Sequence, residues 1–417
     1  MITHSRYFGS ILERKLKKPF VHILFGARQT GKSTLIRGLL PDSATIVDLS
    51  DPRERARFAA RPGLFIDLCR SLPRRDGGQA VFIDEAQTVP ALFDAVQSLY
   101  DDDKERWRFI LCGSSARRLR SSGANLLPGR SVRHILHPLV TEEYDEEPTR
   151  NAKPDARLVT LGDYPESGRS RFTPRSLENR LVFGDLPGIA SLDDDEDRAD
   201  LLSSYATAHL EEEIRREAAI KDWGHFLRFV KFSAGESGGI VNLAGVSRET
   251  GVSAQTIKGY YQLLEDMFIG FPVPAFSGSS RKSALSSPRF FYFDLGVRNA
   301  AAGIPLVEAT VNAVPGSLFE QFIGVQLWRK LAYGAAGSLS YYRTADGAEV
   351  DFVIEKADEI IPVEVKWTEN PSLKDARHLA SFISEHKGRC ARGYVVSRCP
   401  YTLTLNDTIT AIPWWSI

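Results

Sequence analysis

The chain has 417 residues, a length that allows about two to four domains. Its 53 Lys and Arg residues balance 53 Asp and Glu residues, which argues against a strongly basic nucleic-acid coat and leaves room for local basic patches. The four cysteines form no C-x-x-C pair, so neither structural zinc nor a disulfide framework is expected. The sequence shows neither a secretory signal nor an apolar run of membrane-spanning length, so we expect a cytoplasmic protein without a membrane partner.

A glycine-rich loop follows the first predicted strand, which covers residues 21–25. Residues 26–33 match the phosphate-loop pattern G-x-x-x-x-G-K-[ST], and a helix is expected from Thr34. Backbone N–H groups in such a loop point at phosphate oxygens, and the N-terminus of the helix assists them. The candidate nucleotide-binding residues are therefore Gly26, Ala27, Arg28, Gln29, Thr30, Gly31, Lys32, Ser33 and Thr34.

Two residues of this loop have specific expected roles. Lys32 would place a positive charge on the β- and γ-phosphates of ATP, and the Ser33 hydroxyl would bind Mg²⁺. ATP and Mg²⁺ are thus the expected cofactors. A chance glycine turn between a strand and a helix is the alternative, and the complete motif in its correct context argues against it.

The next motif places two acids at the end of an apolar strand. The elements expected before it are a strand at 44–49 and helices at 53–58 and 63–72. Residues 80–83 are apolar, as a strand buried on both faces of a parallel sheet requires, and Asp84 and Glu85 follow them. This is a Walker B pattern, in which Asp84 would reach Mg²⁺ and Glu85 would orient or deprotonate the attacking water. Surface acids that cap a strand end are the alternative.

A polar strand tip and a group of arginines come next. The apolar strand at 108–113 ends at Ser114, which can sense the γ-phosphate. The arginines that follow are Arg117, Arg118, Arg120, Arg130 and Arg133. One of them could act as an arginine finger on a neighbouring subunit of a homo-oligomer, and Arg130 is the preferred candidate. A solvated basic surface is the alternative.

The alternation of strands and helices around a phosphate loop predicts the fold class of residues 1–145. We expect an α/β domain with a doubly wound parallel sheet. The ligand should then lie at the edge formed by the C-terminal ends of the strands, where Gly31, Asp84 and Ser114 would meet.

The middle of the chain has two regions of different character. Residues 146–190 are polar with several prolines, which predicts an insertion or linker. The region 191–300 is expected to be helical, and 240–268 has the rhythm of a helix-turn-helix. Its second helix carries Gln255, Thr256 and Lys258, which could reach a nucleic-acid groove, and the residues that follow could form a wing. A module that serves only for packing is the alternative.

Residues 301–417 carry a second group of functional candidates. Strands are expected at 340–344, 349–354 and 361–366, after a helix at 317–331. Glu320 on the helix and Asp351, Glu364 and Lys366 on the strands should converge on one pocket, because alternate residues of a strand share a face. Such a group could hold Mg²⁺ and activate water for phosphodiester cleavage. A salt-bridged remnant of such a site is the alternative.

The order of these motifs resembles the prokaryotic AAA-like ATPases that carry a C-terminal domain of unknown function. In the first half the resemblance rests on the phosphate loop and the segments 82–87, 113–115, 127–130 and 184–187. In the second half it rests on the helix-turn-helix rhythm and the segments 291–296, 319–320, 347–352 and 362–366. Nearly the whole chain is covered. Gly184-Asp185 stands where relatives tend to have a glycine pair, a difference that we expect to matter only locally.

The resemblance implies an AAA-like core, a winged helix and a small α/β fold of the PD-(D/E)xK restriction-endonuclease type at 301–417. We therefore expect a Mg²⁺-dependent ATPase that acts as a nucleotide switch and whose C-terminal half binds DNA, RNA or another partner. A metal-dependent nuclease regulated by ATP is one alternative. A non-catalytic signalling or scaffold ATPase that recognises protein is the other.

Overall fold

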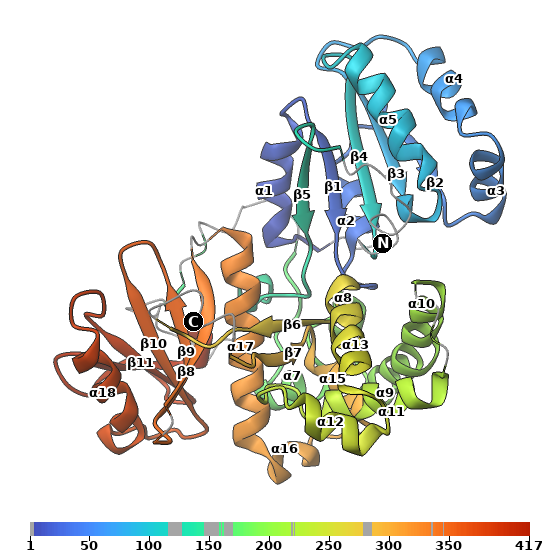
Figure 1. Ribbon diagram of the computed structural model, residues 1–417. Coiled ribbons are helices and arrows are strands. Elements are labelled where there is room, and N and C mark those ends of the chain that lie inside the picture. Colours follow the sequence, from blue (N-terminus) through green and yellow to red (C-terminus); the bar gives the residue numbers. More distant parts are fainter. Residues whose placement is uncertain are drawn as a thin grey trace.

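The computed structural model has two lobes, with the N-terminal residues in the upper lobe of Figure 1. It describes residues 4–115, 127–145, 158–159, 161, 170–217, 220, 222–277, 286–334, 337–344 and 346–417. Three of the expected finger candidates, Arg117, Arg118 and Arg120, lie outside the described residues. Among the described helices, none is both long and apolar enough to cross a membrane.

A five-stranded parallel sheet forms the centre of the upper lobe. Its strands are β1 (Val21–Phe25), β2 (Thr45–Asp48), β3 (Gln79–Asp84), β4 (Trp107–Gly113) and β5 (Ser131–Ile135). Their order in the sheet is β2-β3-β4-β1-β5, and each neighbouring pair is parallel. The carboxyl ends of β3, β4 and β1 therefore lie side by side at one edge. The parallel α/β sheet expected for the N-terminal part is confirmed.

Helices cover both faces of this sheet because its strands carry apolar side chains on both sides. The helices are α1 (Tyr7–Leu16), α2 (Lys32–Leu39), α3 (Pro52–Ala60), α4 (Gly63–Ser71) and α5 (Ala91–Asp102), with a short 3₁₀ turn at Ala86–Thr88. Neighbouring residues of β1 face opposite sides. Ile23 belongs to the core that contains α4 and α5 side chains, whereas Leu24 belongs to the core that contains α1 and α2 side chains.

The stretch from 170 to 190 differs from the linker that we expected over 146–190. It contains α7 (Leu177–Phe183) and α8 (Pro187–Ala190), and Leu181, Val182 and Phe183 are fully buried. Three of the prolines that suggested a linker, Pro148, Pro154 and Pro165, lie outside the described residues. Pro187, further along, occupies the first turn of α8, where its fixed φ is compatible with a helix.

The region after α8 is mainly helical. Its helices are α9 (Asp195–Ser204), α10 (Leu210–Glu217), α11 (Trp223–Gly235), α12 (Leu243–Thr250), α13 (Ala254–Asp266), α15 (Leu295–Ala302) and α16 (Ala309–Ala313), with a π-helical turn at Tyr205–His209. Gly251, with a φ of 72°, ends α12, and the Ser253 hydroxyl caps α13. Strands β6 (Gly270–Val273) and β7 (Arg289–Tyr292) then pair antiparallel. The expected helix-turn-helix rhythm corresponds to α12, its turn and α13.

A six-stranded mixed sheet forms the C-terminal end of the chain. Its strands are β8 (Ser338–Arg343), β9 (Glu349–Glu355), β10 (Ile360–Lys366), β11 (Gly393–Ser397), β12 (Leu403–Thr404) and β13 (Ile409–Pro413), in the order β12-β13-β11-β10-β9-β8. The helices nearby are α17 (Pro315–Tyr333) and α18 (Arg377–Glu385), and 3₁₀ turns cover Thr141–Glu143, Leu373–Ala376 and Trp414–Ser416. Phe322 of α17 shares a core with Phe352, whereas Phe382 of α18 shares a core with Val353. The two helices therefore cover opposite faces of the sheet.

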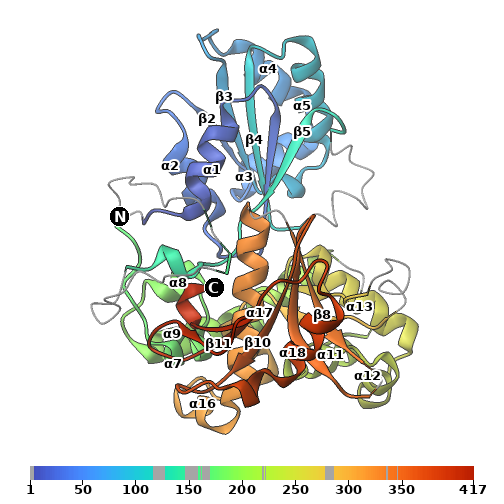
Figure 2. The ribbon, with the colours of Figure 1, turned by 90° about the vertical axis from the view of Figure 1, so that its left-hand side faces the viewer.

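Helix α17 joins the two lobes. Figure 2 shows it running from the lower lobe up to the base of the N-terminal lobe. The ring of Tyr333, at its C-terminal end, stacks on Phe8 of α1 with centroids 5.0 Å apart. The Tyr333 hydroxyl also accepts a hydrogen bond of 2.9 Å from the backbone N–H of His137, just beyond β5. A movement of the upper lobe would therefore change the contacts at the C-terminal end of α17.

Candidate functional site

The loop after β1 turns tightly because two glycines adopt positive φ angles. Gly26 has a φ of 149°, and a Cβ atom there would lie 2.3 Å from the carbonyl oxygen of Leu136. Gly31 follows with a φ of 88°, a conformation that glycine adopts without strain, and α2 begins at Lys32. The Lys32 ammonium donates to the carbonyl oxygens of Gly26 and Ala27 at 2.8 and 2.9 Å. The expected phosphate loop is thus followed directly by a helix, and its lysine lies across the loop.

The two residues expected to bind magnesium are in direct contact. The Ser33 hydroxyl donates to Oδ1 of Asp84 at 2.9 Å, and the Arg37 guanidinium lies 3.7 Å from the other carboxylate oxygen. Burial raises the pKa of Asp84 above its ordinary value, although the Ser33 hydrogen bond opposes that shift. A hydroxyl and a carboxylate side by side offer the oxygen ligands that Mg²⁺ takes beside a nucleotide. These two residues therefore fit a magnesium ion.

Glu85 and Ser114 are joined through a glutamine that the sequence reasoning did not single out. The Gln87 amide donates to a Glu85 carboxylate oxygen at 2.5 Å and to the Ser114 hydroxyl at 3.2 Å. Gln87 is buried, and a Cβ atom on Gly113 would lie 2.8 Å from its amide oxygen. Gln87 belongs to the segment 82–87, on which the family resemblance partly rests. That membership was the one sign in the sequence that Gln87 belongs to the site. The amide thus links the end of β3 to the end of β4.

A cavity of about 610 Å³ lies beside the phosphate loop. Its lining includes Lys32, Ser33 and Glu85, together with Arg28 from the loop and Arg55 from α3. Three of the charged side chains are basic and one is acidic, so the cavity favours a ligand with several negative charges. Its volume is typical of small-molecule sites.

An arginine near the N-terminus ties the phosphate loop to the segment after β5. The Arg6 guanidinium donates to the carbonyl oxygens of Thr30 and His137 at 2.6 and 2.7 Å. It also forms a 2.8 Å ion pair with Glu143, whose side chain is fully buried. The loop is therefore held by contacts outside its own strand and helix.

The phosphate loop also touches the lower lobe. The ring of Phe25 stacks on Phe268, which lies just beyond α13, with centroids 5.7 Å apart. The Tyr205 hydroxyl donates to the carbonyl oxygen of Arg28 at 3.5 Å. In Figure 1 the carboxyl ends of the strands point toward the lower lobe. The candidate site therefore lies where the two lobes meet.

Arg130 lies far from this edge. It directly precedes β5, and its carbonyl oxygen accepts from the N–H of Val21, the first residue of β1. Its guanidinium forms a 2.6 Å ion pair with Asp101. Arg130 is thus at the opposite end of the strands from the phosphate loop of its own chain. A role as a finger in a neighbouring subunit stays a prediction.

The four candidates of the C-terminal region lie together. An Asp351 oxygen accepts from the N–H of Val365 at 2.8 Å, and the Lys366 ammonium lies 2.6 Å from a Glu364 oxygen. Burial raises the pKa of Asp351 well above its ordinary value, and the carboxylates of Glu320 and Glu364 raise it further. The structure therefore brings Asp351, Glu364, Glu320 and Lys366 into electrostatic contact at one side of β9 and β10.

A fifth residue, Arg289 of β7, completes this group and was missed from the sequence. Its guanidinium forms an ion pair with Glu320 and donates to the carbonyl oxygen of Asp351 at 3.2 Å. In the part of the chain that the structure describes, no three His, Cys, Asp or Glu side chains are placed to hold a metal ion. Two cations of the chain itself thus pair with acids of this group, Arg289 with Glu320 and Lys366 with Glu364.

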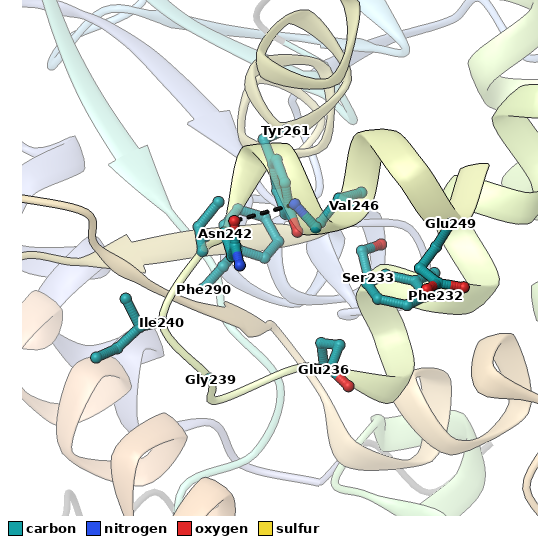
Figure 3. Close-up of a pocket in the computed structure, with 12 residues that line it drawn as sticks. Phe232, Ser233, Glu236, Gly239, Ile240, Asn242, Val246, Glu249, Tyr261 and Phe290 are labelled. Carbon is teal, nitrogen blue, oxygen red and sulfur yellow. Dashed lines mark hydrogen bonds between the residues drawn. The ribbon is translucent and has the colours of Figure 1, made fainter. Parts of the chain in front are cut away.

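The helical region holds a smaller cavity of about 190 Å³, drawn in Figure 3. Phe232, Tyr261 and Phe290 form its apolar wall, and the charged side chains on its lining are Glu236 and Glu249. Both are acidic, so this cavity disfavours a phosphate-bearing ligand.

The second helix of the helix-turn-helix presents a polar face. Gln255, Thr256 and Lys258 are exposed on α13, whereas Ile257 between them is fully buried. The face is accessible to a partner. Contact with a nucleic-acid groove stays a prediction.

A buried ionic network between α7 and α17 centres on Asp185. Its carboxylate accepts from Arg180 at 2.8 Å, from Arg329 of α17 at 3.1 Å and from the Tyr144 hydroxyl at 2.9 Å. Burial alone would raise the pKa of Asp185, but the two guanidinium groups outweigh it and hold the pKa below its ordinary value. The expectation that Gly184-Asp185 matters only locally is wrong, because Asp185 links α7 to α17 and to the segment after β5.

Replacement of Asp185 by asparagine should lower the free energy of unfolding by about 3–5 kcal/mol, since it leaves Arg180 and Arg329 buried with too little compensating charge. Thermal melting of the purified chain measures the loss. Asp102→Asn is the matched control, because its pair with Arg70 is more than half exposed and should be worth about 1 kcal/mol or less. Equal melting temperatures for the two variants would contradict a stabilising role for Asp185.

The chain matches three families in succession. Residues 18–145 match an AAA domain, residues 174–308 match a domain of unknown function (DUF8612), and residues 315–417 match another domain of unknown function (DUF4143). The first match ends at residue 145, just beyond the 3₁₀ turn at Thr141–Glu143, and the last begins at the first residue of α17. Residues 18–145 therefore form an AAA-like P-loop domain, a type that suggests an ATPase.

The relatives of this chain are uncharacterized proteins. One from Mycobacterium tuberculosis and one from Mycobacterium bovis are each 26% identical over 416 residues, covering 99% of this chain and 84% of the relative. A third, from Haemophilus influenzae, is 24% identical over 383 residues, with 88% and 87% covered. A solved structure, of the protein VC1899 from Vibrio cholerae, aligns with 91% of this chain and 89% of its own chain at 13% identity. The TM-score is 0.15, too low to indicate a shared fold.

Proposed function

We propose that the chain binds ATP with Mg²⁺ at the edge of the upper sheet and hydrolyses it as a nucleotide switch. The observation that carries this proposal is the meeting of Lys32, Ser33, Asp84, Glu85 and Ser114 at that edge, beside the large cavity. They come from three adjacent strands, so no rearrangement of the sheet is needed to assemble them. The AAA-domain match over 18–145 supports the same conclusion.

Each of these residues has a chemical task in the proposal. Lys32 would exchange its bonds to the loop carbonyls for phosphate oxygens. Ser33 and Asp84 would hold Mg²⁺, which neutralises charge on the phosphates when bound. Glu85 would orient the attacking water or accept its proton, and Gln87 would hold that carboxylate in position.

The proposed nucleotide switch is supported by the position of the phosphate loop, which contacts the lower lobe. Contacts between Phe25 and Phe268 and between Arg28 and Tyr205 connect the loop to the lower lobe. A ligand that repositions the loop would change these contacts, and a ligand shifts a conformational equilibrium only through such differential contacts. Binding or hydrolysis of the nucleotide would therefore change the conformation of the helical and C-terminal parts of the chain. We propose that a partner binds to those parts.

Removal of Mg²⁺ tests the proposed hydrolysis of ATP. The purified full chain should release phosphate from ATP in the presence of Mg²⁺, and release should stop on addition of excess EDTA and resume when Mg²⁺ is restored. Phosphate release that continues without divalent ions, or that never occurs at millimolar ATP and Mg²⁺, would contradict the proposal.

The nuclease alternative has less support from the C-terminal group. Arg289 already pairs with Glu320 and Lys366 with Glu364, and a metal ion would have to compete with both cations. We propose that this group links β7 to α17 and β9 and does not cleave nucleic acid.

Calorimetry checks this second proposal. Titration of the Lys32→Ala chain with Mn²⁺ should give no heat of binding at millimolar metal, because that variant is expected to lack the nucleotide-linked metal. Glu364→Ala in the same background is the control. A binding isotherm that Glu364→Ala removes, or Mn²⁺-dependent cleavage of plasmid DNA, would overturn the proposal.

A further inference from the structure

We infer that Arg55 of α3 is the arginine that contacts the γ-phosphate of ATP during hydrolysis, and that it acts on the nucleotide of its own chain. This inference rests on the proposed ATPase function. Arg55 lines the same cavity as Lys32, Ser33 and Glu85, although it comes from a separate element. It therefore offers a charge from the wall of the cavity outside the phosphate loop.

The position of α3 follows from the strand before it. Asp48, the last residue of β2, pairs directly with Asp84 of β3, so the chain leaves β2 beside the magnesium ligands. Helix α3 then begins at Pro52, with the Asp51 carboxylate accepting from the N–H of Arg53 at 2.8 Å. Arg55 is one turn inside this helix. The capped helix start thus fixes the place from which Arg55 reaches the lining of the cavity.

Arg55 differs from Arg53 and Arg57 on the same helix in its ion-pair partners. Arg53 forms an ion pair with Asp51 at 3.1 Å, and Arg57 forms one with Glu54 at 3.4 Å. Arg55 forms no ion pair with any carboxylate of the described residues, and it faces a cavity that also contains Arg28 and Lys32. A side chain that carries an unneutralised charge into a basic cavity is suited to an anionic ligand.

Arg130, which the sequence suggested as a finger for a neighbouring subunit, does not fill this role in its own chain. Arg130 lies at the opposite end of the strands and pairs with Asp101, so it cannot reach the phosphates held by its own loop. Arginine fingers supplied within the same chain occur in other phosphoryl-transfer enzymes. With Arg55 in this role, the site of one chain is complete.

The reaction to be assisted is the attack of water on the γ-phosphorus. The water oxygen bonds to that phosphorus as the bond to the β–γ bridging oxygen breaks, and the electron pair of that bond stays on ADP. The water proton passes to Glu85, and phosphate leaves. Arg55 would stabilise the negative charge on the γ-phosphoryl oxygens and on the bridging oxygen, which grows toward the transition state.

The test compares Arg55→Ala and Arg55→Lys with Arg53→Ala, an exposed arginine on the same helix, in the full-length chain. Arg55→Ala should lower kcat by about 10³-fold or more, the range for arginine fingers, and leave the affinity for Mg·ADP within about twofold of wild type. It should also lose the complex of ADP with aluminium fluoride, which imitates the transferred phosphoryl group. Arg55→Lys should recover part of kcat, and Arg53→Ala should behave as wild type.

The outcomes separate this inference from the proposed function. Wild-type turnover or retained aluminium fluoride binding in Arg55→Ala would overturn the inference alone, as would a parallel loss of ADP affinity, which indicates a structural role. A mixture of Arg55→Ala and Lys32→Ala chains should stay inactive, and restored activity would show action between subunits and overturn it. A wild-type chain that neither binds nor hydrolyses ATP would contradict the proposed function and the inference together.

Discussion

Replacement of Lys32 by alanine is expected to abolish tight ATP binding while the chain stays folded. In the structure the Lys32 ammonium is held by two carbonyl oxygens of the phosphate loop and lines the large cavity. The side chain contributes charge at the place where the β- and γ-phosphates would lie. Calorimetric titration with Mg·ATP measures the lost affinity, and a melting curve without nucleotide measures the fold.

Lys104→Ala is the control for this prediction. Lys104 belongs to the same lobe, but its ammonium lies near the ring of Tyr100, at 5.9 Å from the centroid, on the outer surface. Its loss should change neither binding nor melting. If Lys32→Ala bound ATP as wild type does and melted normally, the phosphate loop would not be the nucleotide site.

The phosphate loop and the Walker B acids could be predicted because each is a short contiguous motif beside an apolar strand. The fold then adds a simple geometric rule. Parallel strands end at one edge, so residues that follow β1, β3 and β4 must be neighbours once these strands are adjacent. This is why Ser33 reaches Asp84 although 51 positions separate them.

The position of Arg130 could not be read from its place in the sequence. It was expected to act on a neighbouring subunit, and the sequence alone does not say at which end of its own sheet it lies. The chain returns to the other end of the sheet before β5 begins, because β5 runs parallel to β1. A parallel strand must start at the edge far from the ligand, and the residue just before it is carried there.

Other residues of the site depend on contacts between distant segments, which composition does not reveal. Asp185 meets Arg329 across 144 positions, and Arg289 meets Glu320 through the packing of β7 against α17. Helix α7 was taken for a linker because prolines and polar residues surround it. Its burial comes from helices that lie far away in the sequence.

Replacement of Glu85 by glutamine should leave ATP binding intact and slow hydrolysis by about 10²–10⁴-fold, the range for general-base and positioning roles. Glu85 follows β3 with a φ of 53°, an uncommon angle for a residue other than glycine, which directs it away from the line of the strand. The Gln87 amide then holds its carboxylate beside Ser114. Glutamine keeps the size of this side chain but cannot accept the proton of water.

The measurement pairs single-turnover phosphate release with a calorimetric ATP titration, so that binding and chemistry are separated. Glu54→Gln on α3 is the matched control, because it makes the same chemical change in the same lobe at a carboxylate that pairs with Arg57. Its turnover should equal that of wild type. Near-wild-type turnover in Glu85→Gln would remove Glu85 from the chemistry. Lost ATP affinity in that variant would instead assign the carboxylate to binding, because an interaction made only in the transition state leaves the affinity for the ground state unchanged.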